Sequence, residues 1–181
     1  MSSPVATAAE VVGFWREAGP AKWFSKDDAF DAEFDQRFRD AHFAAARREL
    51  DGWAGTAEGT LALLVLLDQF PRNVFRGTGH AFATDPLARH FAREALATGR
   101  DRQVEPALRL FCYLPFQHHE DAADQDRAVE LMRSSGMDAK WALHHREIIR
   151  RFGRFPHRNA ALGRESTAEE IAFLRDGGFT G

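Results

Sequence analysis

Apolar residues recur at helical spacing along most of the chain, and no segment alternates with the period of two that is typical of a β-strand. The segment 57–70 contains the apolar run Leu61–Leu67 and is apolar on all sides, which is the pattern of a buried helix. Within the segment 28–50, four residues fall on one helical face: Phe30, Phe34, Phe38 and Ala41. The pattern predicts an all-α protein in which the segment 57–70 is the central helix.

Capping and breaking residues determine where the predicted helices begin and end. Thr7 and Thr84 are predicted N-caps, and Ser166–Glu169 is a predicted capping box, because a hydroxyl accepts the free N–H groups of a first turn. Pro71 is predicted to end the central helix, because proline lacks the N–H that a helix interior needs. The predicted helices cover about 8–18, 28–50, 57–70, 85–98, 106–113, 121–135, 138–151 and 168–176.

About nine helices joined by short loops favour antiparallel helix hairpins. The chain has 181 residues, of which 44% are hydrophobic and 28% charged, and this is the composition of one ordinary globular domain. We therefore expect a single helical domain over residues 1–181, with residues 1–6 flexible.

Composition and charge exclude several classes of function. A net charge of −3 does not favour nucleic acid binding. The N-terminus has no basic and apolar signal segment, and Leu61–Leu67 is too short to span a bilayer, so we expect a cytoplasmic protein without membrane contact. Cys112 is the single cysteine, which rules out an intramolecular disulfide; in its apolar surroundings we expect it in the core.

The first candidate for chemistry is the segment Asp68–Asn73. Asp68 lies on the apolar face of the central helix, where a charge is costly to bury unless it is paired. Arg72 follows four residues later, but Pro71 is expected to break the geometry of a plain i,i+4 pair. Two interpretations stay open. Asp68 either fastens the helix end to a neighbouring Arg or to loop N–H groups, or it faces a ligand and acts as an acid or base.

A second segment, Phe155–Asn159, echoes Phe70–Asn73, and we call these the second and the first Phe-Pro segment. Each follows a helix rich in apolar residues and precedes a loop with Gly and Arg. Two such loops that converge would offer guanidinium and amide groups to one anion or carboxylate. Alternatively, the arginines form two Arg–carboxylate clasps that hold the loops in place.

Histidines supply the remaining candidates. The run His118–Glu120 is not followed by a second His four residues on, and the Glu-x-x-His motif of di-iron bundles is absent from the chain, so no metal site is predicted. His145 falls on the apolar face of the predicted helix 138–151. It is either a satisfied core residue or, beside a carboxylate, a group that titrates near neutral pH and acts as an acid or base.

These motifs resemble a bacterial family known only as domain of unknown function 924. The resemblance covers nearly the whole chain, and its most specific parts are Phe14-Trp15, Trp23-Phe24, Leu61–Asn73, Ala81–Asp85, Leu114–Phe116, His118, Glu120, Gln125, His145-Arg146, Arg151–Asn159 and Leu162–Arg164. It implies an all-helical, tetratricopeptide-like superhelical fold and no established activity. Family members usually have Ser where this chain has His119, which argues against a shared metal site there.

We predict a small-molecule binding domain for an anionic ligand, and leave open whether it is an enzyme. The predicted acid–base residues are Asp68, His118, Glu120 and His145. The predicted ligand-binding residues are Arg72, Asn73, Gln125, Arg154, His157, Arg158, Asn159 and Arg164. No cofactor is predicted. The alternative is a helical-repeat-like domain that binds a protein partner on an exposed concave surface, with these polar residues acting as internal clasps.

Overall fold

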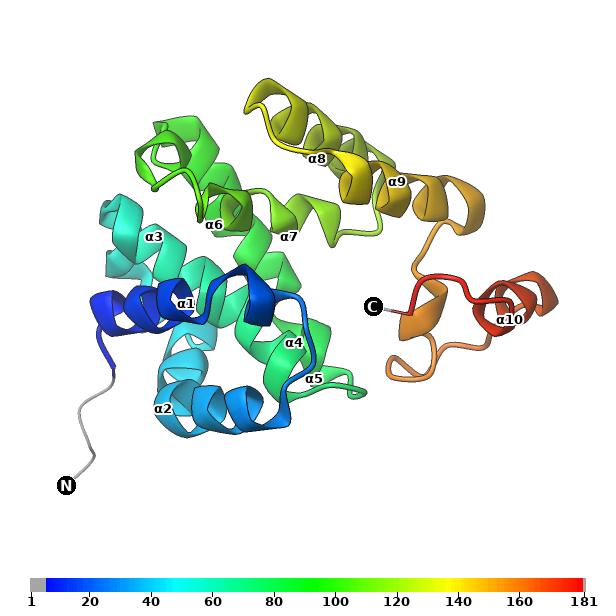
Figure 1. The fold of residues 1–181 in the computed structure, drawn as a ribbon, viewed down its shortest axis with the longest axis horizontal. Coiled ribbons are helices and arrows are strands. Elements are labelled where there is room, and N and C mark those ends of the chain that lie inside the picture. The colour runs from blue at the N-terminus through cyan, green and yellow to red at the C-terminus, as the bar shows by residue number, and fades with distance from the viewer. Residues whose placement is uncertain (1–5, 181) are drawn as a thin grey trace. The chain divides into compact units, whose positions relative to one another are not determined.

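The computed structural model describes residues 6–180, and these residues form helices and turns without a β-strand (Figure 1). The all-α prediction is therefore confirmed. The predicted flexibility of residues 1–6 lies, except for Ala6, outside the described residues. The described residues divide into two compact units, one within Met1–Arg76 and His80–Pro115, the other within Gly77–Gly79 and Phe116–Gly181. The single domain and the tetratricopeptide-like superhelix stay predictions.

The first unit contains six α-helical segments among its described residues: α1 (Ala8–Trp23), α2 (Asp28–Ala46), α3 (Ala57–Leu64), α4 (Phe70–Val74), α5 (His80–Ala83) and α6 (Asp85–Thr98). A π-helical turn, η2 (Val65–Gln69), joins α3 to α4. Three short 3₁₀ segments complete this unit: η1 (Asp51–Gly55), η3 (Asp101–Gln103) and η4 (Arg109–Cys112).

The boundary between the units falls within α7 (Leu114–Gln117). The second unit then contains α8 (Ala122–Ser134), α9 (Lys140–Phe152), the 3₁₀ segment η5 (Pro156–Arg158) and α10 (Ala168–Arg175). Helices α8 and α9 pack against each other as a hairpin, as the short connection between them predicts (Figure 1). The last helix begins at Ala168, and its capping box lies one residue later than predicted, because Thr167 is the N-cap and pairs with Glu170.

The first helix begins and is interrupted where the sequence predicts. Thr7 caps α1 and forms a capping box with Glu10. Gly19 takes a φ of 68° and kinks the helix, a backbone conformation that glycine adopts without steric cost. The chain then makes one more helical turn that ends at Trp23.

Two predicted α-helices are wrong in extent or type. The second helix ends at Ala46 instead of Leu50, because Arg48 takes a φ of 66°, which a continuing right-handed helix does not allow. The segment predicted as an α-helix over 106–113 forms turns and the 3₁₀ helix η4. In a segment this short, tertiary packing decides between the two helix types.

The core of the first unit surrounds α3 and η2. Every residue of Leu61–Leu67 is buried, as predicted for the central helix, and burial of one such Leu or Val side chain stabilises the fold by about 1.5–3 kcal/mol. Aromatic rings from α1 and α2 pack beside it: the ring centre of Phe14 lies 5.2 Å from that of Phe34 and 5.2 Å from that of Phe38. The ring of Phe34 in turn meets that of Phe70 at 5.0 Å.

Pro71 does not end the central helix, so this prediction is wrong. The π-helical turn η2 directs the N–H of Phe70 to the carbonyl of Val65, five residues earlier. Pro71 then lies in the first turn of α4, where its missing N–H costs little and its fixed φ suits a helix. The chain is consequently helical without a break from Ala57 to Val74.

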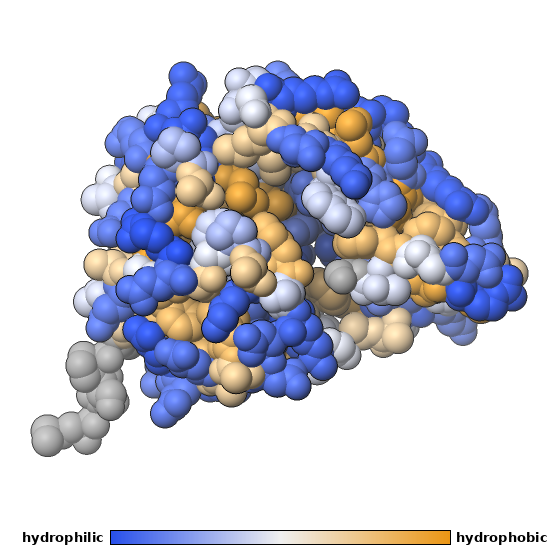
Figure 2. All heavy atoms as spheres, viewed as in Figure 1, coloured by the Kyte–Doolittle hydropathy of each residue, from blue (hydrophilic) through white to orange (hydrophobic). Residues whose placement is uncertain are grey.

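The second unit has a smaller apolar core. One cluster of this core has Ile148, Ile149 and Phe155 as its buried members, with the partly buried rings of Phe152, Phe173 and Phe179 packed against them. Helix α8 contributes further buried apolar side chains. In the view of Figure 2, most of the surface is hydrophilic, and hydrophobic residues show between the polar ones on both units. Among the described helices, none combines the length and the apolar character that crossing a membrane requires.

Candidate functional site

The first Phe-Pro segment follows a π-helical turn whose main-chain carbonyls bind side chains. The carbonyls of Leu66 and Leu67 lack their usual α-helical donors, because the N–H of Phe70 donates to the Val65 carbonyl and Pro71 has no N–H. Three side chains donate to this turn: His42 Nδ1 to the Leu66 carbonyl at 2.8 Å, Thr84 Oγ1 to the Leu67 carbonyl at 2.6 Å and Arg72 Nη1 to the Asp68 carbonyl at 2.8 Å. Side chains thus satisfy carbonyls of this turn that lack a main-chain partner.

Thr84 consequently has a different role from the predicted one. It precedes α6 as the N-cap residue, but its hydroxyl caps no N–H of that helix. Its main-chain carbonyl accepts the N–H of Ala88 instead, at 2.9 Å. The predicted Thr84 side-chain cap is therefore wrong, because the hydroxyl donates to the π-helical turn.

His42 and His80 form a pair that the sequence analysis missed. A carbonyl only accepts, so the bond to Leu66 fixes the proton of His42 on Nδ1, and Nε2 accepts from His80 Nε2, 3.0 Å away. Burial is the main reason that the pKa of His42 falls from 6.5 to about 4; the bond to the Leu66 carbonyl opposes this shift, and the charges of His80 and Arg39 add to it. A signal was present in the sequence, since His42 follows Phe38 by four residues on the same apolar stripe.

Arg72 joins two carboxylates. It donates both terminal nitrogens to Asp85, at 2.8 and 2.9 Å, and Nη1 also lies 3.0 Å from Asp68 Oδ1. Burial opposes the charge on Arg72, but Asp68 and then Asp85 outweigh it and raise the pKa of Arg72. The expectation that Pro71 would disrupt the Asp68–Arg72 pair is wrong, because the chain stays helical through Pro71.

The neighbouring Asn73 is also engaged. Its Nδ2 donates to Asp31 Oδ1 at 3.0 Å, and Arg76 Nε donates to Asp31 Oδ2 at 3.1 Å. Asp31 belongs to α2, so these bonds connect the first Phe-Pro segment to that helix.

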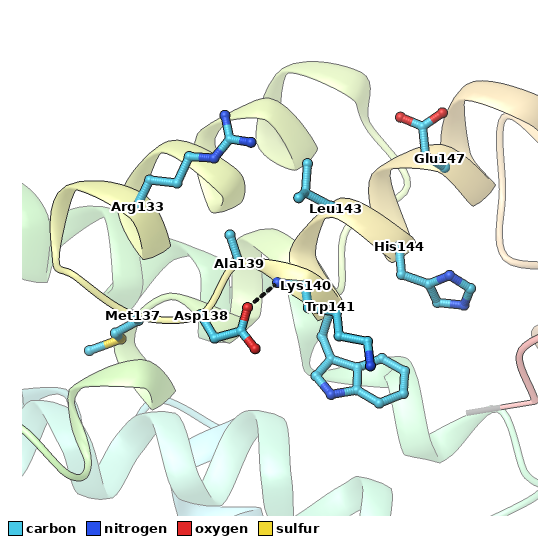
Figure 3. A pocket seen from close by; sticks show the side chains of 9 residues that line it. All are labelled: Arg133, Met137, Asp138, Ala139, Lys140, Trp141, Leu143, His144 and Glu147. Carbon is cyan, nitrogen blue, oxygen red and sulfur yellow. Dashed lines mark hydrogen bonds between the residues drawn. The ribbon is translucent and has the colours of Figure 1, made fainter.

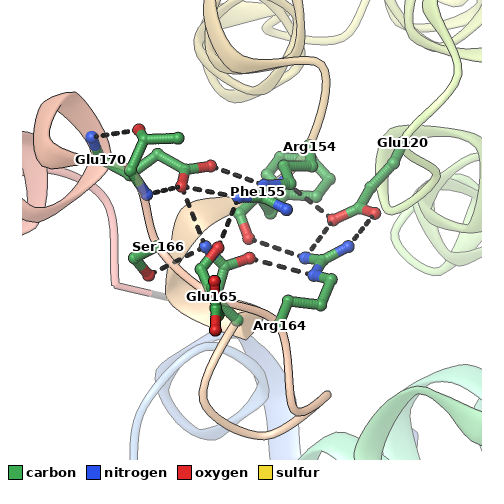
Figure 4. Close-up of polar contacts among 9 residues, drawn as sticks. Glu120, Arg154, Phe155, Arg164, Glu165, Ser166 and Glu170 are labelled. Carbon is green, nitrogen blue, oxygen red and sulfur yellow. Dashed lines mark hydrogen bonds and ion pairs between the residues drawn. The ribbon is translucent and has the colours of Figure 1, made fainter.

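The second Phe-Pro segment is held by Glu120 (Figure 4). Arg164 donates to both carboxylate oxygens of Glu120, at 2.7 and 3.0 Å, and the N–H of Phe155 donates to Oε1 at 2.8 Å. Burial alone would raise the pKa of Glu120, but the bonds from Arg164 and Phe155 lower it below its usual value. Glu120 is therefore a charged anchor for the loop.

A second carboxylate anchors the same segment from α10 (Figure 4). Arg154 donates to both oxygens of Glu170, at 2.6 and 2.8 Å, and Asn159 Nδ2 donates to Glu170 Oε2 at 3.2 Å. The bond from Arg154 is the main reason that the pKa of Glu170 falls to about 2. Glu170 was not among the predicted site residues, although it is one residue from the predicted capping box.

His145 is buried in the second unit, on the apolar face of α9 as predicted. Its Nδ1 donates to the carbonyl of Trp141 at 2.7 Å, which leaves the lone pair on Nε2, and none of the described residues hydrogen-bonds that atom. Burial lowers the pKa of His145 from 6.5 to about 3, with smaller contributions from neighbouring cationic and titratable groups. Its ring centre lies 5.5 Å from that of Phe155 and 6.4 Å from that of His118. His145 is therefore a neutral imidazole at physiological pH.

The remaining predicted residues lie around this region of the second unit. Gln125 Nε2 donates to the carbonyls of Gln117 and His119, at 2.7 and 2.6 Å, and so holds the turn before α8. Arg158 is buried with its guanidinium carbon 4.5 Å from the ring centre of Phe155. The ring of His157 lies 5.7 Å from that of Phe155.

The start of α8 carries one group of side chains whose donor atoms suit a cation. His119, Asp121 and Asp124 each place one ligand atom within 4.8 Å of the others. All three already interact within the protein, because His119 Nδ1 lies 2.7 Å from Asp124 Oδ2 and Asp121 Oδ1 caps the helix. The prediction of no metal site stays a prediction.

The structure thus brings the predicted residues together in two groups. Asp68, Arg72 and Asn73 belong to the first unit; the others belong to the second: Gln125, Arg154, His157, Arg158, Asn159, Arg164, His118, Glu120 and His145. The convergence of both Phe-Pro segments on one site stays a prediction.

A groove lies on the α8–α9 hairpin (Figure 3). The residues that line it were not predicted from the sequence. The groove encloses about 850 Å³ and is lined by Arg133, Met137, Asp138, Ala139, Lys140, Trp141, Leu143, His144 and Glu147. Trp141 is 58% exposed, although tryptophan is usually well covered in folded proteins. The apolar part of the lining and the open form of the groove match the general anatomy of a recognition surface.

These features define an all-helical protein with two internally ion-paired Phe-Pro segments. The chain belongs to the bacterial protein family of unknown function DUF924, whose profile matches residues 11–178. It is 59% identical to a protein of unknown function from Agrobacterium tumefaciens whose solved structure superimposes with a TM-score of 0.90, covering 94% of this chain and 97% of that chain. No curated protein matches the chain. The family predicted from the sequence motifs is confirmed.

Proposed function

We propose that this protein is a helical interaction domain that binds a segment of a partner protein in the α8–α9 groove. The observation that carries this proposal is Trp141, a large aromatic side chain that is 58% exposed within an apolar groove. Exposed aromatic anchors of this kind contribute most of the binding energy in many protein interfaces. Helix hairpins commonly offer such grooves to extended or helical peptide segments.

The ion pairs of the Phe-Pro segments support this proposal over an anion site. Each of three predicted ligand-binding arginines already donates twice to a carboxylate of the protein: Arg72 to Asp85, Arg154 to Glu170 and Arg164 to Glu120. An anionic ligand would have to displace these carboxylates; separation costs roughly 3–5 kcal/mol for a buried pair and less for the partly exposed pairs of Arg154 and Arg164. The arginines therefore act as internal clasps, as the interaction hypothesis expects.

Selection of peptides from a displayed random library on the purified protein tests the proposal. We expect Trp141→Ala to weaken binding of the selected peptides about 30-fold, because loss of a central anchor typically costs about 2 kcal/mol. Fluorescence anisotropy with labelled peptides measures this change. Ile171→Ala is the matched control, because Ile171 is 54% exposed on α10 and does not line the groove. Equal affinity of both variants for the selected peptides would refute the proposal.

A second candidate function, small-molecule binding with acid–base chemistry, is favoured by His145. Its imidazole is neutral, its Nδ1 is anchored on the Trp141 carbonyl, and its Nε2 lone pair can accept a hydrogen bond from a bound molecule. Native mass spectrometry of the protein purified from its own host would detect a retained molecule. We expect His145→Gln to abolish that retention with the thermal midpoint little changed. A variant that unfolds, or one that retains the molecule, would assign His145 a structural role.

Asp68 belongs to the same test because it is the other buried acid–base candidate. Asp68→Asn is expected to leave ligand retention intact, since the carboxylate is occupied by Arg72. A cytoplasmic location stays a prediction for either function.

A further inference from the structure

We infer that the partner segment of the α8–α9 groove is apolar and carries carboxylate groups. This inference rests on the proposed function and names the chemistry of the partner. It follows from the charges that line the groove, which differ in whether the protein itself neutralises them.

The acidic groups of the groove are engaged by the protein. Glu147 lies 3.3 Å from Arg150 and 3.8 Å from Arg146. Asp138 accepts the main-chain N–H of Lys140 at 2.9 Å, at the positive end of α9 (Figure 3). Neither acid is therefore well placed to attract a basic partner.

The basic groups of the groove have no such partners. Within residues 6–180, neither Arg133 nor Lys140 forms an ion pair. Lys140 Nζ lies 5.9 Å from the ring centre of Trp141, so the cation stands beside the exposed aromatic anchor. The four charged lining residues, Arg133 and Lys140 against Asp138 and Glu147, sum to zero. The two cations are the members whose side chains form neither an ion pair nor a hydrogen bond in the part of the chain that the structure describes.

The lining between these charges is apolar. Met137, Ala139, Trp141 and Leu143 contribute to it, and Figure 3 shows Arg133 on α8 and Lys140 with Trp141 on α9. A segment that fills the groove must therefore bury apolar side chains against Trp141 and bring charge that suits Arg133 and Lys140. Glu or Asp side chains satisfy this requirement, because like charges opposite the two cations would be left uncompensated.

The peptides selected on the wild-type protein provide the probes for the test. One selected peptide is synthesised in three forms. All three keep its apolar residues, and all remaining positions carry Glu in the first form, Gln in the second and Lys in the third. We expect the Glu form to bind best and the Lys form to bind about tenfold more weakly, which corresponds to about 1.4 kcal/mol from two exposed charge pairs together. The preference should shrink with added salt.

Charge reversal identifies the residues responsible. The double variant Arg133→Glu with Lys140→Glu should reverse the order of the three peptides. The matched control is Arg127→Glu with Arg175→Glu, because both arginines are exposed residues of the same unit outside the groove and the change in net charge is identical. This control should keep the wild-type order.

The possible outcomes separate the two proposals. Equal binding of the Glu, Gln and Lys forms, or an unchanged order in the Arg133/Lys140 variant, would overturn the acidic partner and leave the groove as a binding site. Failure to select any peptide that depends on Trp141 would overturn the proposed function and this inference with it.

Discussion

The two Phe-Pro segments have nearly the same sequence but are stabilised differently. Phe70 and Pro71 lie within a continuous helix, and the ring of Phe70 stacks on His42 at 4.8 Å and meets Phe34 at 5.0 Å in an aromatic core. Phe155, in contrast, precedes a 3₁₀ turn and belongs to a small cluster in which Ile148 and Ile149 are the other buried members. The same short motif therefore adopts helix or turn according to the packing around it.

The polar contacts of the two segments differ in burial. In the first segment, the Asp68 side chain is 1% exposed and pairs with Arg72, which also binds Asp85. In the second, the Glu120 side chain is 25% exposed where it pairs with Arg164. A buried pair is costly to break, whereas water can replace one partner of an accessible pair. Similar Arg–carboxylate clasps therefore need not contribute equally to stability.

Truncation of the two phenylalanines should have the largest effect. We expect Phe70→Ala to lower the free energy of unfolding by about 5 kcal/mol and Phe155→Ala by about 3 kcal/mol, because neighbours in the smaller core can relax into the cavity. Urea unfolding followed by tryptophan fluorescence measures both. Phe24→Ala is the control, since Phe24 is largely exposed and its loss should cost little. A larger loss for Phe155→Ala would contradict the ranking of the two cores.

Neutralisation of the two carboxylates should have an intermediate effect. We expect Asp68→Asn to destabilise the protein by about 3 kcal/mol, because the buried Arg72 loses one of its two carboxylate partners and retains Asp85. Glu120→Gln should cost about 1–2 kcal/mol, because water can reach the freed Arg164. Thermal and urea unfolding at pH 7 test the order. Equal losses would mean that burial does not distinguish the two clasps.

Acidification should act gradually, through the two buried histidines. The pKa of His42 falls to about 4 and that of His145 to about 3, from 6.5 in each case, so the unfolded chain binds more protons than the folded one. Stability should therefore be constant above about pH 6.5 and decline toward pH 4, by at most about 1.4 kcal/mol per pH unit for each histidine. Unfolding midpoints between pH 7.5 and 4.5 would record this decline.

Single substitutions show which of the two compact units causes the loss of stability at acid pH. His42→Gln and His145→Gln should each make the pH dependence shallower, because each removes one group that must lose its proton on folding. A slope that neither variant changes would show that other groups cause it. Glu170 affects stability in a separate pH range. Because its pKa is about 2 in the folded protein, its contribution to stability is lost only below about pH 4.5.

Local sequence signals were reliable where the chain alone decides the structure. Thr7 caps α1, Gly19 interrupts it, and Gly99 ends α6 in the left-handed conformation. Burial of Leu61–Leu67 followed from an apolar pattern on all sides of the helix. These features depend on neighbours within one or two helical turns, so that periodicity and capping chemistry were sufficient to predict them.

Residues with long-range partners were predicted only in part. The sequence singled out Asp68 as costly to bury without a partner and Glu120 and Arg72 as site candidates, but it did not identify Asp85 or Glu170 as partners. The pair of His42 and His80 was missed for the same reason. A histidine on an apolar face can be recognised as a hydrogen-bonding group only once the carbonyl that it binds is known. The groove around Trp141 was not predicted either, since exposure depends on what packs against a helix.

The residue pattern alone established that the chain is helical, that Thr7 caps its first helix, and that Asp68 is costly to bury without a partner. The tertiary structure decided that Pro71 continues a helix, because side chains from α2 and α6 supply donors to the carbonyls of the π-helical turn. It also decided which carboxylate each arginine binds. The physical reason is distance along the chain: helix propensity and capping act over a few residues, whereas an ion pair such as Arg164–Glu120 joins residues 44 positions apart.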